Sequence, residues 1–94
     1  MTKEELVSKI QEIEDRNYYK RSQFLIDFFE GITETYINEE ELPTDEQTFL
    51  GALAYSIDTI LEIMNKALDD YTDLCALLDA VNARLDTLKY TKGS

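Results

Sequence analysis

Apolar residues in the second half of the chain recur at alternating steps of three and four, and this spacing constrains the fold more than any other feature. Such spacing lines one face of a helix and is typical of the heptad seam of a coiled coil or helical bundle. No proline follows position 44, and Gly51 lies near the start of the pattern, so we predict one uninterrupted helix over residues 45–89. The predicted seam consists of Leu50, Leu53, Ile57, Ile60, Met64, Ala67, Tyr71, Leu74, Leu78, Val81, Leu85 and Leu88.

The apolar surface of this predicted helix is wider than the seam. Phe49, Ile63 and Leu77 flank the seam on one side, and Ala54, Leu61, Leu68 and Cys75 flank it on the other. A two-stranded coiled coil usually carries charged residues at such flanking positions. The wider apolar surface therefore favours a bundle, in which the helix contacts at least two others.

The single proline, Pro43, divides the chain in two. Proline fixes its own φ and biases the preceding residue away from the helical region. We therefore predict an acidic turn over residues 39–44 and an earlier helix over residues 3–38. Thr2 stands three residues before Glu5, the spacing of a capping box, and this marks the start of the first helix. Residues 90–94 are expected to be a frayed tail.

The apolar residues of the first segment follow two registers. Leu6, Ile10 and Ile13 share one register. A second register, offset by one position near Asn17, is shared by Tyr18, Ser22, Leu25, Phe29, Ile32 and Tyr36. The offset fits either a kink in one long helix or a short interruption between helices over residues 3–16 and 18–38. We expect the kinked helix, because residues 15–17 contain neither glycine nor proline.

Together these features predict a single all-α domain of 94 residues, folded as an antiparallel helical hairpin. The hairpin offers more apolar surface than one partner helix covers, including Phe24, Phe28 and Phe29. Because two hairpins can cover that surface as a four-helix bundle, we predict a homodimer. A monomeric bundle, or a hairpin completed by a different protein, are the alternatives.

Charge is distributed unevenly along the chain. Twenty acidic and nine basic residues give a net charge of -11, and residues 22–83 hold fourteen acids against one base, Lys66. In a single hairpin the two chain ends meet opposite the turn, so we expect a near-neutral open end and a strongly negative turn end. A net negative charge repels phosphate backbones and argues against direct nucleic-acid binding.

Residue types missing from the chain exclude most catalytic chemistry. With no histidine, Ser-His and Cys-His nucleophiles and histidine-containing metal sites are absent. Glu12 and Asp15 have the spacing of a magnesium-binding carboxylate pair, but the sequence lacks a second pair to complete the site. We expect no enzyme activity, no metal site and no cofactor.

The expected location is cytoplasmic and the expected chain is soluble. The start of the sequence lacks the features of a secretory signal peptide, and no apolar stretch approaches the ~20 residues that span a bilayer. The lone Cys75 has no partner for an internal disulfide, as suits a reducing compartment. No membrane association is expected.

The leading functional hypothesis is a small acidic protein-binding protein, an adaptor or regulator, that uses the bundle surface to contact another protein with a basic surface. The alternative is an acidic nucleic-acid mimic that inhibits a DNA- or RNA-binding protein such as a nuclease, as phage and mobile-element inhibitors do. Acidity that serves only solubility is a third interpretation. The predicted partner-binding residues are Glu39, Glu40, Glu41, Asp45, Glu46, Asp58 and Glu62.

Overall fold

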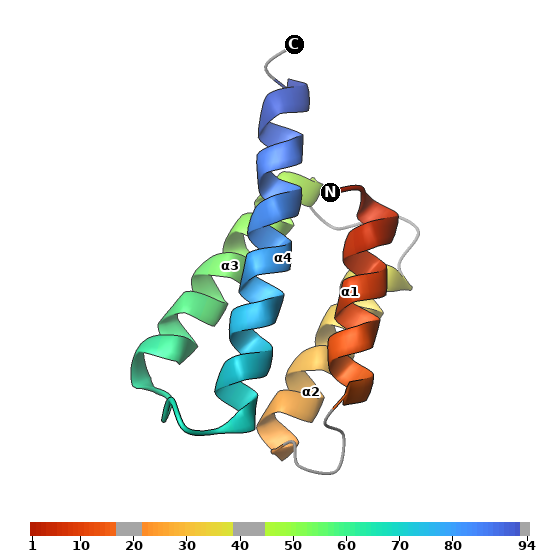
Figure 1. Ribbon diagram of the computed structural model, residues 1–94. Helices are drawn as coiled ribbons and strands as arrows, with labels where there is room; N and C mark the ends of the chain where they lie inside the picture. Colours follow the sequence, from red (N-terminus) through yellow and green to blue (C-terminus); the bar gives the residue numbers. More distant parts are fainter. Residues whose placement is uncertain (17–21, 39–44, 93–94) are drawn as a thin grey trace.

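The regular structure of this protein is entirely helical in residues 1–16, 22–38 and 45–92, which are the residues that the computed structural model describes. The elements are α1 (Lys3–Arg16), α2 (Gln23–Ile32), the π-helical segment η2 (Thr33–Ile37), α3 (Glu46–Ile63) and α4 (Asp69–Lys92). Successive α-helices run in opposite directions, and α4 packs against α3 and α1 while α2 lies behind them (Figure 1). The all-α prediction is confirmed for these residues.

The predicted continuous helix over residues 45–89 is wrong. α3 ends at Ile63, and Met64 has extended dihedral angles, φ -86° and ψ 147°. The Asn65 side chain then accepts a hydrogen bond from the amide of Ala67 at 2.9 Å, a local turn that competes with the helical pattern. A 45-residue helix would measure ~67 Å, whereas the longest dimension of the molecule is 42 Å. The reversal allows both parts of the seam to pack against one core.

The predicted helix over residues 3–38 is also divided, so the interruption is correct and the kinked helix is wrong. Ser22 is extended, with φ -67° and ψ 155°, and its hydroxyl accepts a hydrogen bond from the amide of Leu25 at 3.3 Å. The side chain that we placed in an apolar register thus caps α2. At the start of α1, the Thr2 hydroxyl accepts a bond from the Glu5 amide at 3.1 Å, as a capping box requires.

Two smaller boundaries differ from the predictions. α3 begins at Glu46 with Asp45 as its N-cap, and α4 continues to Lys92 instead of ending at residue 89. α2 passes into η2, where the amide of Asn38 bonds to the carbonyl of Thr33 at 2.9 Å and widens the last turn. The predicted turn at 39–44 and the expected register slip at Asn17 lie outside the described residues.

The predicted hairpin of two long helices is therefore wrong, because the described chain reverses direction more often than a hairpin does. The described residues of one chain already supply four α-helices, so the homodimer is no longer needed to complete a bundle. The predicted separation of charge between the two ends is also wrong. Glu46 bonds to Arg84, which also bonds to the carbonyl of Met1, so the start of α3 and the chain's first residue share one end.

The core lies where the inner faces of all helices meet. The predicted seam takes part unevenly: Leu50, Ile57, Leu74 and Val81 are buried, whereas Ala67 lies exposed in the connection after α3. Tyr71 is half-buried, and the remaining seam residues pack partly buried against the core. The buried apolar residues are Leu6, Ile10, Ile13, Leu25, Phe29, Ile32, Tyr36, Leu50, Ile57, Leu74, Leu77, Ala80 and Val81.

No helix in the described part of the chain has both the length and the apolar character needed to cross a membrane.

Two isoleucines on α3 provide a matched test of this core. Ile57 is fully buried and Ile63 is 85% exposed. We expect Ile57→Ala to lower the free energy of unfolding by about 3 kcal/mol through lost burial and a residual cavity. Ile63→Ala should change it by less than about 0.5 kcal/mol. Urea denaturation followed by circular dichroism measures both, and equal losses would contradict the orientation of α3.

Candidate functional site

The predicted acidic contact residues fall into three groups. Glu39, Glu40 and Glu41 lie outside the described residues. Asp45 caps α3, where its carboxylate accepts bonds from the Thr48 amide at 2.9 Å and the Thr48 hydroxyl at 2.8 Å. The remaining three residues, Glu46, Asp58 and Glu62, lie on α3, and only Asp58 and Glu62 are exposed.

Glu46 belongs to a polar cluster that joins four segments of the chain. Both of its carboxylate oxygens accept bonds from the Arg84 guanidinium, at 2.8 and 2.9 Å, and the Tyr36 hydroxyl donates to Oε2 at 2.5 Å. Arg84 also donates to the carbonyl of Met1 at 3.1 Å, and the Met1 amine donates to the Thr87 hydroxyl at 2.6 Å. We call these five residues the polar cluster.

Aromatic contacts hold Tyr36 in place beside the polar cluster. Its ring stacks on Phe49 with centroids 5.6 Å apart and an interplanar angle of 3°. The Lys3 ammonium lies 4.9 Å from the centre of the Tyr36 ring, within cation–π range. Tyr36 is fully buried, so η2, α1 and α3 meet around one side chain.

The electrostatics of this cluster indicate a structural role. Hydrogen bonding to Arg84 lowers the pKa of Glu46 below its usual range. Burial, followed by the neighbouring Glu46, raises the pKa of Tyr36 well above its ordinary value. Both shifts move away from neutral pH, whereas a general acid or base works best with a pKa near the operating pH. The cluster therefore favours one fixed ionisation state for each group.

At the other end of α4, two acidic residues hold α1 and α2. Asp73 is almost fully buried, and its Oδ1 lies 3.5 Å from the Arg16 guanidinium. The neighbouring Asp70 accepts a bond from the Ser22 amide at 3.3 Å through Oδ2, while its Oδ1 is buried and has no hydrogen-bond partner among the described residues. These contacts connect the end of α1 and the start of α2 to the first turns of α4.

Exposed acidic residues lie on all four described α-helices, but α2, η2 and α3 differ from α1 and α4 in their basic residues. These three elements contain no lysine or arginine. On α2 and η2, Asp27, Glu30 and Glu34 follow one another at helical spacing and all are exposed. Phe24, one turn before Asp27, is 53% exposed, and its ring lies 6.3 Å from that of Phe28. We call Phe24, Asp27, Glu30 and Glu34 the α2 outer face.

The sequence contained a signal for the α2 outer face, namely acids spaced three and four apart with no base between them. Our predicted contact residues centred on the acidic turn and did not include Asp27, Glu30 or Glu34. The structure buries Phe29 and leaves Phe24 half exposed. Only the packing of α2 decides which of these phenylalanines faces outward.

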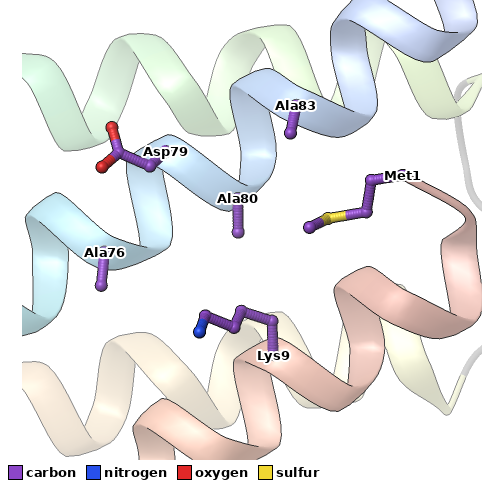
Figure 2. Close-up of a pocket in the computed structure, with 6 residues that line it drawn as sticks. All are labelled: Met1, Lys9, Ala76, Asp79, Ala80 and Ala83. Carbon is purple, nitrogen blue, oxygen red and sulfur yellow. The ribbon is translucent and has the colours of Figure 1, made fainter.

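A shallow groove of about 330 Å³ separates α1 from α4. Ala76, Ala80 and Ala83 form its α4 side, where their small side chains leave space between the helices. Figure 2 shows Met1 and Lys9 extending toward these alanines, while Asp79 points away from the gap. Among the described residues, no group of three or more acidic or cysteine side chains is placed to bind a metal ion.

No protein-family model, curated protein or solved structure matches this chain.

The Glu46–Arg84 pair makes a pH-dependent contribution to stability. We expect Glu46→Gln to lower the free energy of unfolding at pH 7 by about 2 kcal/mol, because it leaves Arg84 largely buried without its charged partner. Since the pKa of Glu46 is lower in the folded protein, this contribution is present above pH 4.5 and is lost as the pH falls through the folded pKa.

Urea denaturation at pH 7 and pH 3 measures this effect as the difference between the native protein and the variant. Glu62→Gln is the matched control, since Glu62 is exposed, and it should change stability by less than about 0.5 kcal/mol at either pH. A Glu46→Gln difference that persists undiminished at pH 3 would contradict the ion pair.

Tyr36 should resist ionisation until the protein unfolds. Its raised pKa means that the neutral phenol stabilises the fold below pH 10.0, and that this contribution is lost as the pH rises above the unfolded value. In an alkaline titration at 295 nm, we expect a late phase that coincides with unfolding and disappears in Tyr36→Phe. Tyr55→Phe, which alters a 76% exposed side chain, should remove amplitude from the early phase instead. Early ionisation of all six tyrosines would contradict this placement.

Proposed function

We propose that this protein is a small, non-catalytic protein-binding domain, an adaptor or regulator, whose α2 outer face docks on the basic surface of another protein. The observation that carries the proposal is the combination of a half-exposed phenylalanine and three exposed acids on one helix with no basic residue. Protein interfaces commonly combine an aromatic anchor with charged residues around it. The acids would orient the basic partner and raise its association rate, and the phenylalanine ring would provide apolar contact area.

The acids of the α2 outer face are available to a partner. Glu30 and Glu34 form no ion pair or hydrogen bond with the described residues, and Asp27 accepts only a bond from Gln23 at 2.9 Å. Gly31, on the same exposed helix, has open space where a Cβ would lie. A partner backbone can therefore approach α2 closely beside these carboxylates.

The spacing of the acids supports docking on a protein more than mimicry of a nucleic acid. Asp27, Glu30 and Glu34 are separated by three and four residues, or about 5 Å along the helix on average. One strand of duplex DNA carries a charge every ~3.4 Å along its axis. The acidic mimic stays the alternative function, and it depends on the same surface together with Asp58 and Glu62 on α3.

Neutralisation of three acids tests the proposed surface. The full chain is immobilised, basic proteins of a cell lysate are captured and identified, and the purified partner is titrated by calorimetry. We expect Asp27→Asn, Glu30→Gln and Glu34→Gln together to weaken binding about 10-fold, since each charge contributes a few tenths of a kcal/mol or more. Phe24→Ala should weaken binding further through lost contact area.

The matched control removes the same number of charges elsewhere. Glu4→Gln, Glu12→Gln and Asp86→Asn alter exposed acids of α1 and α4, and we expect a change within about 2-fold. Equal weakening by both sets would show that only total charge matters and would reject the α2 outer face. Displacement of the partner by duplex DNA would favour the mimic, whereas a partner unaffected by DNA would favour the adaptor.

A further inference from the structure

Two large apolar side chains are exposed where α3 is connected to α4. Ile63, the last residue of α3, is 85% exposed, and Leu68, the residue before α4, is 47% exposed. Both belong to the apolar flanks of the predicted seam, and the reversal at Met64 leaves them outside the core. Apolar side chains that are exposed together on one short connection favour a contact surface. We call Ile63 and Leu68 the connection patch.

Local hydrogen bonds fix the backbone of the connection patch. The amide of Leu68 donates to the carbonyl of Asn65 at 3.2 Å, and the carbonyl of Leu68 accepts a bond from the amide of Tyr71 at 3.1 Å. The Asn65 side chain accepts a further bond from the amide of Ala67 at 2.9 Å. Because the backbone that carries Leu68 is already ordered, a partner that binds there pays little conformational entropy to order it.

The connection patch lies at the same end of the molecule as the start of the α2 outer face. Figure 1 shows the end of α3, the start of α4 and the start of α2 together at the lower end of the view. The Ser22 amide bonds to the Asp70 carboxylate at 3.3 Å and joins the starts of α2 and α4. A partner segment that covers the connection patch can therefore continue onto Phe24 and the acids that follow it.

Exposed acids accompany the apolar residues at this end. Each residue of the connection patch has an exposed acid as its neighbour in the chain, Glu62 beside one and Asp69 beside the other. Residues 58–69, all of which the structure describes, contain three acids and a single base, Lys66. The α2 outer face repeats this combination of an apolar residue with acids. A complementary partner therefore presents large apolar side chains flanked by lysine or arginine.

These charges distinguish between the molecules that could cover the connection patch. Membrane-surface segments carry lysine and arginine beside their apolar residues, whereas acids are repelled by anionic lipids. A second copy of the chain brings a further net charge of -11 toward the same acids. We infer that the connection patch binds a basic amphipathic segment of the protein that docks on the α2 outer face. This inference rests on the proposed function and adds the class of segment that is recognised.

A synthetic peptide provides the probe for a calorimetric titration of the full chain. It is about 14 residues long, or about 21 Å as a helix, with a pair of leucines one turn apart and lysines on either side of them. The control peptide has alanine in place of each leucine and the same charge. We expect the leucine peptide to bind at least about 10-fold more tightly. It should keep this advantage at about 500 mM sodium chloride, because salt screens charges and leaves apolar contacts in place.

Variants of the full chain locate the contact. Ile63→Ser and Leu68→Ser together should weaken binding of the leucine peptide about 10-fold and change that of the alanine peptide by less than about 2-fold. Tyr55→Ser is the matched control, because this 76% exposed side chain also lies one turn from an exposed acid, Asp58, but in the middle of α3. It should change binding of either peptide by less than about 2-fold. Circular dichroism and the urea midpoint establish that each variant is folded.

Three results would overturn the inference: equal binding of the two peptides, equal weakening by the double variant and Tyr55→Ser, or no binding of the leucine peptide at about 1 mM. Each of them leaves the α2 outer face to its own test. In the opposite case, the leucine peptide depends on the connection patch but is unaffected when Asp27, Glu30 and Glu34 are neutralised. That result would support the connection patch and reject the α2 outer face.

Discussion

The inner face of α4 is the feature on which the other helices depend. Its middle, around Leu74, Leu77 and Val81, is apolar and buried against the core. Its two ends are polar: Asp70 and Asp73 contact Ser22 and Arg16 at one end, and at the other Arg84 binds Glu46. Apolar burial provides most of the stabilisation, and the polar contacts set the order and orientation of the helices, because a charge left without its partner in a buried position is costly.

This arrangement leaves exposed acidic residues on the outward sides of α2 and α3, two helices that contain no lysine or arginine. The outward side of α2 combines Phe24 with Asp27 and Glu30, and the outward side of α3 combines Tyr55 with Asp58 and Glu62. Bases within the described helices lie on α1 and α4, where Lys3, Arg16 and Arg84 contact groups of the same chain. Charge separation in this molecule therefore runs between helices and not between the two ends of a rod.

The sequence patterns predicted helix well and helix ends poorly. The seam correctly indicated amphipathic helix on both sides of Met64. Because the same apolar spacing continues through the connection between α3 and α4, it predicted one continuous helix where the chain reverses direction. Asn65 was the available signal, since its side chain takes the amide of Ala67 and the acids that follow favour a new helix start. Ser22 was a similar signal for α2. At the candidate site, acid spacing alone could indicate Asp58 and Glu62 as exposed, yet it could not separate them from Glu46, which Arg84 binds.

Composition and periodicity by themselves determined that this chain is all-α, strongly acidic and free of histidine chemistry, because those properties depend on residue types and on spacing along one helix. Only the tertiary structure decided where the helices reverse, which phenylalanine of the first segment is buried, and that Glu46 and Met1 share one end. Each of these outcomes depends on contacts between residues far apart in the chain. Local spacing carries no information about such contacts, and the free energy of burying the whole apolar surface selects among the locally acceptable alternatives.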